Sequence, residues 1–306
     1  MGTTQLGLRG RFSYIYSLPD RALVCHDLGR GCRLKASRAI LRTEFKALNA
    51  PMKVLYIAGE VSPFSETTAA AHLLRLIPNA IQESETGDYE VRIMMPRYGV
   101  VSERRNRLHE VIRLSGAEIT VGEDQDILKV KVASIPGIRL QVYFMDSILY
   151  FKRKGLHKDR KDGKVFEDNP ARALFYAQAA LSTAHKLGWS PDVIHATGWI
   201  AAFVPTLARA ADGDALFTDT KCVYTPDTVD TKIVLSAKEA KTFGLPSDLA
   251  GKTLQQIGME TADAVAYADD FEGGPEGTSL IGEEEEIVAR AMELYNSLAE
   301  QRELAA

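Results

Sequence analysis

The chain has 306 residues, of which 45% are hydrophobic and 25% are charged, and its formal net charge is −4. A chain of this length buries one good hydrophobic core or two small ones. Residues 1–51 carry nine Lys and Arg against three Asp and Glu, a charge of +6 that leaves −10 for the remainder. That remainder offers nucleic acid no basic face, and no apolar run approaches the roughly 20 residues that span a bilayer.

Residues 1–51 are rich in Arg, poor in acids and weakly periodic, so we predict that they lie outside the folded domain. Two interpretations remain open for them: an N-terminal targeting presequence, or a start codon assigned too far upstream. The three cysteines, Cys25, Cys32 and Cys222, have neither a metal-ligand spacing nor the pattern of a disulfide framework. We therefore expect a reduced, cytoplasmic protein with one domain over residues 52–306 and with neither a metal nor a cofactor.

The domain opens with a predicted strand, a loop and a helix. Residues 53–58 form a short apolar run that ends at Gly and Pro residues, as in a buried parallel strand. Apolar residues then recur at helical spacing over 69–81. The loop 59–68 therefore follows the carboxyl end of a strand and precedes a helix, which is where open α/β sheets bind ligands.

The next part of the chain predicts a second strand at 89–95 and then short runs over 107–145, read as inserted strands and hairpins. The lysine-rich segment 152–164 reads as a solvated loop. Asp168 precedes a long helix over 171–187, in a natural N-cap position.

A strand at 192–196 and a single helix at 199–209 repeat the opening plan. Further along, the pattern predicts a strand at 221–225, a helix and a strand within 254–268, and a final helix over 283–300. The predicted fold class is α/β, with a single Rossmann-like parallel sheet, helices on both faces and a β-hairpin excursion.

The opening residues KVLYIAGEVSPFSETTAA resemble the start of the bacterial glycogen synthases and plant starch synthases, which reads K-V-L-x-V-[AS]-x-E-x-x-P-F-x-K-T-G-G-L. The strand, Glu60, Pro63, Phe64 and Thr67 match this pattern. The segment PDVIHATGW resembles a second family motif, P-D-V-[VI]-H-x-H-D-W. The resemblance covers roughly residues 52–268 and implies the acceptor-side half of a GT-B glycosyltransferase that uses ADP-glucose to extend an α-1,4-glucan.

The residues that carry the family's chemistry are largely replaced. The resemblance places Glu66 where the family has lysine, Thr68 and Ala69 where it has glycines, and Thr197 where it has the second histidine. A lysine ~4 Å from a bound diphosphate stabilises it by about 4 kcal/mol at an effective dielectric of ~20. A glutamate at the same position would destabilise the bound diphosphate on the same scale.

Two candidate catalytic residues remain, Asp168 and His195, although the pattern favours a helix cap for Asp168 and a buried core or rim histidine for His195. The candidate substrate-binding residues implied by the resemblance are Glu60, Thr67, Thr68 and Trp199. Trp199 is placed to stack on a sugar, or alternatively to pack in the core.

Two functions remain open. The first is a starch or glycogen synthase-like glycosyltransferase domain that is impaired or inactive alone, with ADP-glucose and an α-glucan as ligands. The second is a non-catalytic protein that binds a glucan or a protein partner through the cleft face. We expect that face to collect the loop 59–68, His195 and Pro226, because all three follow the carboxyl ends of strands.

Overall fold

The computed structural model describes residues 50–84, 87–210, 216–228 and 232–305. The chain divides into two units, 1–49 and 50–306, and the described residues all belong to the second. The leader over 1–51 stays a prediction, because 1–49 lie outside the described residues together with Cys25 and Cys32. No helix in the described part of the chain is long and apolar enough to cross a membrane.

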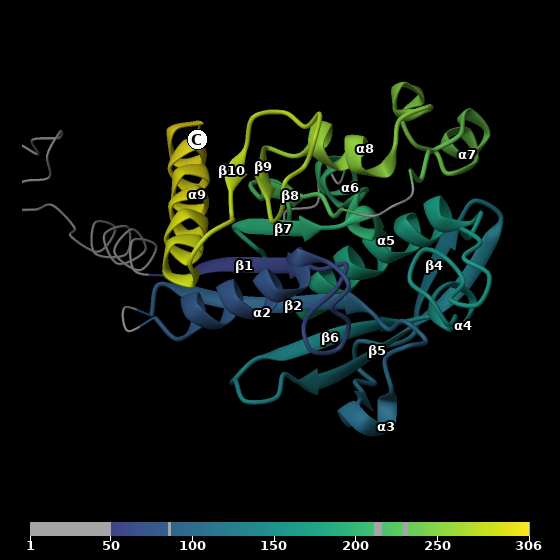
Figure 1. Ribbon diagram of the computed structural model, residues 1–306, viewed down its shortest axis with the longest axis horizontal. Coiled ribbons are helices and arrows are strands. Elements are labelled where there is room, and N and C mark those ends of the chain that lie inside the picture. The colour runs from purple at the N-terminus through teal and green to yellow at the C-terminus, as the bar shows by residue number, and fades with distance from the viewer. Residues whose placement is uncertain (1–49, 85–86, 211–215, 229–231, 306) are drawn as a thin grey trace, which may run out of the picture. The chain divides into compact units, whose positions relative to one another are not determined.

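A single sheet runs through the described residues (Figure 1), with the strand order β10-β9-β8-β7-β1-β2-β6-β5-β3 and β4 paired to β5. Seven of these strands pair in parallel. They are β1 (Met52–Ile57), β2 (Tyr89–Pro96), β6 (Gln141–Asp146), β7 (Val193–Thr197), β8 (Lys221–Thr225), β9 (Ala264–Tyr267) and β10 (Thr278–Ser279). The predicted α/β class with a Rossmann-like parallel sheet is confirmed.

The predicted excursion forms three strands that pair in antiparallel fashion with one another or with β6. They are β3 (His109–Glu110), β4 (Ala117–Val121) and β5 (Asp124–Ser134). The run 108–114 was read as a strand, but only β3 forms there. The chain then turns, because the amides of Leu114 and Ser115 both donate to the carbonyl of Val111.

The helices over 69–81 and 171–187 are confirmed as α2 (Ala69–Gln82) and α5 (Asn169–Leu187). The other helices are α3 (Glu103–Asn106), α4 (Ile148–Phe151), α6 (Val204–Ala210), α7 (Ala237–Thr242), α8 (Leu254–Thr261) and α9 (Glu284–Ala305). Parallel crossovers are right-handed, so α2 covers one face and α5, α6 and α8 cover the other. The helix α9 packs against α2, which places both on the first face (Figure 1).

The prediction of one helix over 199–209 was wrong. A 3₁₀ turn, η1 (Trp199–Ala201), comes first and α6 begins only at Val204. Pro205 explains the break, because it has no amide hydrogen to donate to the carbonyl of Ala201 and its ring would clash with that carbonyl.

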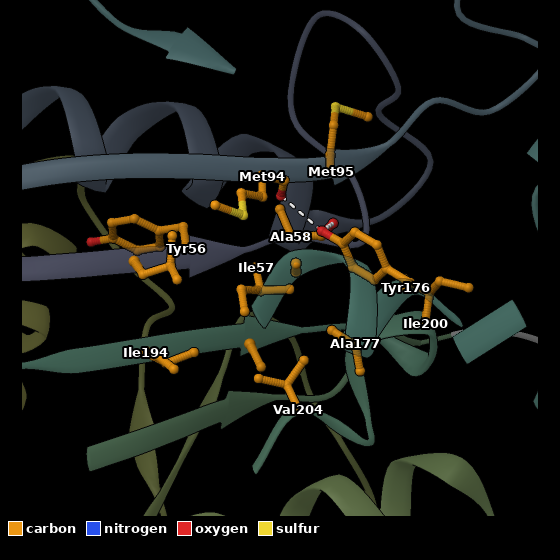
Figure 2. Close-up of a cluster of buried hydrophobic side chains, with 14 of the residues drawn as sticks. Tyr56, Ile57, Ala58, Met94, Met95, Tyr176, Ala177, Ile194, Ile200 and Val204 are labelled. Carbon is orange, nitrogen blue, oxygen red and sulfur yellow. Dashed lines mark hydrogen bonds between the residues drawn. The ribbon is translucent and has the colours of Figure 1, made fainter. Parts of the chain in front are cut away.

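One tyrosine ties the centre of the sheet to α5. The hydroxyl of the fully buried Tyr176 lies 2.8 Å from the carbonyl oxygens of both Ala58 and Met94. Figure 2 shows this hydroxyl reaching the ends of β1 and β2 from a surrounding apolar cluster. The two strand ends are thereby held in register where the ligand-facing loops begin.

A second buried polar group joins α9 to the sheet. The hydroxyl of Tyr295 on α9 lies 2.7 Å from Nδ1 of His195 on β7 and 3.1 Å from the hydroxyl of Tyr56 on β1. Nε2 of His195 lies 2.7 Å from Oγ1 of Thr225 on β8. Burial lowers the pKa of His195 to about 3, so the imidazole is neutral and serves as a hydrogen-bonding link between three strands and a helix.

We predict that Tyr295→Phe destabilises the protein by about 1–3 kcal/mol, because it leaves Nδ1 of His195 and the hydroxyl of Tyr56 buried without this partner. The unfolding midpoint, followed by circular dichroism, should fall by about 2–4 °C for each kcal/mol. The matched control is Tyr89→Phe, whose hydroxyl bonds to Asn296 at a partly exposed position where water can replace it. Equal shifts in the two variants would contradict this account of α9 docking.

Candidate functional site

The carboxyl ends of β1, β7 and β8 meet at one edge of the sheet, and two glycines let their loops touch there. The amide of Gly59 donates to Oγ1 of Thr197 at 3.2 Å. A Cβ at Gly59 would lie 2.9 Å from the carbonyl oxygen of Thr197, and one at Gly198 (φ +78°) would lie 2.6 Å from Oδ2 of Asp227. Thr197, where the resemblance expects a second histidine, therefore supplies a buried hydroxyl that fixes the first loop.

A buried carboxylate shapes the loop 59–68. Glu60 is 5% exposed and accepts hydrogen bonds from the hydroxyl of Ser65 and from the amide and hydroxyl of Thr67, the last at 2.8 Å. The donors all belong to the loop itself. Glu60 therefore acts as an internal anchor that sets where the following residues point.

Glu66 projects from the same loop and is exposed. Its Oε2 accepts a hydrogen bond from the hydroxyl of Ser62 at 2.7 Å. Thr68 stands in extended conformation before α2, and its side chain makes no cap hydrogen bond. Because Glu60 is buried, Glu66 is the carboxylate of this loop that faces outward. The first turn of α2 adds no acidic residue to it.

The loop forms one wall of a cavity of about 710 Å³, called here the loop cavity. The opposite wall comes from the segment 155–160, so part of the lysine-rich segment read as a solvated loop lines a cavity as well. Residues with polar side chains on the two walls include Glu66, Thr67, Thr68, His157, Lys158 and Arg160. Two of the predicted substrate-binding residues, Thr67 and Thr68, thus line this cavity, beside Glu66.

Asp168 occupies the predicted N-cap position of α5, but its side chain makes no cap hydrogen bond. Its carboxylate instead accepts two hydrogen bonds from the guanidinium of Arg153, Nη1 to Oδ1 at 2.6 Å and Nη2 to Oδ2 at 2.5 Å. The interpretation as a helix cap was wrong for the side chain. The bidentate pair holds the segment before α5 to the start of the lysine-rich loop.

Trp199 is 3% exposed, packs in the core and also lines a second cavity. The guanidinium carbon of Arg172 lies 5.5 Å from the centroid of its ring. Arg172 is fully buried, donates to the carbonyls of Tyr150 and Leu156, and has its pKa lowered to about 10 by burial. A ring face that holds a buried cation is not free for stacking on a sugar.

His195 lies away from both cavities. Its two ring nitrogens bond to Tyr295 and Thr225 beneath the edge, and it is 1% exposed. The structure therefore separates the two candidate catalytic residues: His195 lies inside the sheet and Asp168 pairs with Arg153. A catalytic role for either stays a prediction.

The second cavity has a volume of about 560 Å³ and is called here the Asp227 cavity. Asp227 is 8% exposed, and burial raises the pKa of its carboxyl to about 7. Its Oδ1 accepts hydrogen bonds from the amide of Trp199 at 3.3 Å and from the side-chain amide of Gln255. The sequence analysis did not select Asp227, although an acid directly after a buried parallel strand was a usable signal.

Metal ligands do not gather in the described part of the chain, where no group of three or more His, Cys, Asp or Glu side chains could hold an ion. Cys222 is buried, and burial raises its thiol pKa to about 12. The side chains that line the two cavities are carboxylates, hydroxyls and the basic residues His157, Lys158, Arg160 and Lys232 together with apolar groups.

The open, mostly parallel sheet with its loops at one edge is a Rossmann-like fold, and it matches the fold of a GT-B glycosyltransferase domain. The chain superposes on the starch synthase IV catalytic domain from Arabidopsis thaliana, a structure bound to ADP and acarbose, with a TM-score of 0.57 at 19% identity. This match covers 71% of this chain and 45% of that one. A family model described as the starch synthase catalytic domain matches residues 53–270, so the chain belongs to this family.

Curated relatives agree with this assignment. The chain is 35% identical over 244 residues to a glycogen synthase from Chlorobium limicola, covering 75% of this chain and 49% of the relative. It is 38% identical over 220 residues to a glycogen synthase from Chlorobium luteolum, covering 69% and 44%. The chain thus spans about half or less of the length of these relatives.

We predict that Asp227→Asn stabilises the protein above about pH 7. The folded-state pKa lies above the ordinary value of 3.8, so the stability that the protonated carboxyl contributes is lost as the pH rises toward 7. An uncharged Asn does not titrate. The difference in unfolding midpoint between variant and wild type should therefore grow from pH 4 to pH 7 and then level off.

The matched control is Asp146→Asn, because Asp146 is equally buried but paired, with Nε of Arg97 at 3.0 Å and Nζ of Lys131 at 2.8 Å. Removing that charge leaves Arg97 and Lys131 with only the partly exposed Glu103, at 3.0 and 2.8 Å, and should cost about 1–3 kcal/mol. Equal destabilisation by Asp227→Asn would contradict this prediction, because it would mean that Asp227 also has a charged partner in the folded state.

Proposed function

We propose that this chain is the acceptor-side domain of a starch or glycogen synthase-type glycosyltransferase, and that the chain alone does not transfer glucose. One observation carries the proposal: Glu66 lines the loop cavity at the position where the resemblance places a lysine. The fold is the one that carries the family activity. The substitutions in the loop 59–68 support the proposal that this activity is impaired.

The electrostatics of the loop argue against a bound diphosphate. Glu66 lies on the cavity wall and Glu60 lies buried beneath it, with hydroxyl and amide donors as its partners. A phosphate at the start of α2 would meet two carboxylates from the loop. Repulsion by one charge at ~4 Å costs about 4 kcal/mol at an effective dielectric of ~20.

Two side chains add a steric obstacle at the same place. Thr68 and Ala69 carry Cβ atoms where glycines would let an anion reach the backbone amides. Lys158 and Arg160 on the opposite wall supply positive charge, but Arg160 is exposed, so salt weakens its attraction. The balance favours weak or no binding of ADP-glucose.

The second candidate function is a non-catalytic protein that binds a glucan or a protein partner at this edge. It is favoured by the two cavities, about 710 and 560 Å³, which both reach Thr228 and have apolar wall residues such as Phe64 and Phe271. Cavities of this size suit small ligands. Retarded migration in glycogen-containing gels would favour this candidate over an edge that binds nothing.

We predict no glucosyl transfer when the purified chain is incubated with labelled ADP-glucose and glycogen. Glu66→Lys alone should not restore transfer, because Thr68, Ala69 and Thr197 still differ from the family residues. The measurement is incorporation of label into precipitated glycogen.

A heat-denatured sample serves as the blank, and the glycogen synthase from Chlorobium limicola serves as the positive control. Incorporation by the wild-type chain above the blank would overturn the proposed impairment. Recovery of transfer by Glu66→Lys alone would show that the charge at that position is the whole cause.

A further inference from the structure

The Asp227 cavity holds a carboxylate with one oxygen available. Oδ1 of Asp227 accepts hydrogen bonds from the amide of Trp199 and the side chain of Gln255, whereas Oδ2 accepts none from the residues that the structure describes. Gln255 is itself fixed, because its Oε1 accepts from the hydroxyl of Tyr224 at 2.9 Å and from the amide of Asp227 at 3.2 Å. The available oxygen therefore belongs to a side chain whose position is set.

Glycine lets this carboxylate lie close against the loop that follows β7. A Cβ at Gly198 would lie 2.6 Å from Oδ2 of Asp227, closer than a side chain can approach. Gly198 also has φ +78°, a conformation that other residues rarely adopt. The position of the Asp227 side chain therefore depends on residue 198 being glycine.

The carboxylate lacks a counter-charge. Within the described residues no Lys, Arg or His side chain forms an ion pair with Asp227, although Lys232 lines the same cavity. The charged residue that contributes to the raised pKa of Asp227 is Glu60, which is also negative. A buried carboxylate without a cation is costly, so a cationic ligand would relieve that cost.

The remaining walls suit a cation with an aliphatic body. Leu254, Met259 and Phe271 supply apolar surface, and Phe271 is held by stacking on Tyr267 with ring centroids 6.0 Å apart. Two further acids, Asp270 and Glu272, lie at the exposed part of the cavity. Methylene groups can pack on such walls, and an ammonium gains from both carboxylates and an aromatic ring.

We propose that the Asp227 cavity is a binding site for an aliphatic amine, with an ammonium group donating to Oδ2 of Asp227 and the methylene chain lying against Met259 and Phe271. In a short diamine the second ammonium reaches Asp270 or Glu272. The volume of about 560 Å³ lies in the range of small-molecule sites.

This site differs in charge from the proposed sugar-nucleotide chemistry. A phosphate would face three carboxylates, those of Asp227, Asp270 and Glu272, against the one cation Lys232, so the net charge of the cavity disfavours it. A neutral sugar hydroxyl could donate to Oδ2 but would leave the buried charge uncompensated. The amine is the ligand that satisfies both the hydrogen bond and the charge.

The test is isothermal titration of the full chain with 1,4-diaminobutane at about pH 8, where the carboxyl of Asp227 is ionised. We expect saturable binding that Asp227→Asn weakens by about tenfold or more, because a charge-assisted hydrogen bond is lost. The neutral isostere 1,4-butanediol should bind at least tenfold more weakly. The matched control Glu66→Gln, which removes a carboxylate from the loop cavity, should leave diamine binding unchanged.

Circular dichroism establishes that each variant is folded. If Asp227→Asn does not fold, Phe271→Ala provides the second test, with several-fold weaker diamine binding expected from the lost apolar wall. Absence of saturable binding, equal binding of 1,4-butanediol, or undiminished binding by the cavity variants would overturn the proposal. Displacement of the diamine by maltose would reassign the cavity to sugars, and none of these results depends on whether the chain transfers glucose.

Discussion

The parallel pairing of β1 with β2 on one side and β7 on the other is the constraint on which the rest of the structure depends. Parallel strands share one direction, so their following loops must open at the same edge. The hydroxyl of Tyr176 fixes the ends of β1 and β2 (Figure 2). The hydrogen bond between Gly59 and Thr197 fixes the loops of β1 and β7. Both cavities follow from that alignment.

The buried carboxylates at and behind this edge are stabilised in two different ways. Asp146 lies in a network with Arg97 and Lys131, so each charge has a partner and the group contributes to holding β5, β6 and the end of β2 together. Asp227 and Glu60 have neutral donors instead. These two carboxylates have no cationic partner and lie at the edge of the sheet where ligands bind in this kind of fold. Ionisable groups in such unfavourable surroundings are often found at functional sites.

Much of the fold could be predicted because strong periodicity marks it. The buried runs of β1, β7 and β8 and the amphipathic pattern of α2 were recognised with their bounds nearly correct. Other predictions were wrong because single residues interact in ways that the apolar pattern does not show. Pro205 breaks a helix whose apolar spacing is otherwise continuous, and Asp168 prefers the guanidinium of Arg153 to the amides that a cap would use.

The site was predictable only in part, for a physical reason. The loop 59–68 is contiguous in sequence, so its substituted residues could be read directly. The Asp227 cavity draws on Trp199, Asp227, Gln255 and Phe271, which come together only through tertiary packing. Similarly, His195 is neutral and linked to Tyr295 from a helix 100 residues further along the chain. No local pattern contains that contact.

The central claim is that the sheet edge keeps the family scaffold while its first loop no longer binds a nucleotide diphosphate. Titration of the chain with ADP-glucose tests it most directly, using the bulky neutral substitution Thr68→Trp to block the loop cavity and Thr120→Trp as a control on the exposed side of β4. The account predicts no saturable binding by the wild type and none by the Thr120→Trp control. Saturable binding that Thr68→Trp abolishes and Thr120→Trp preserves would contradict it.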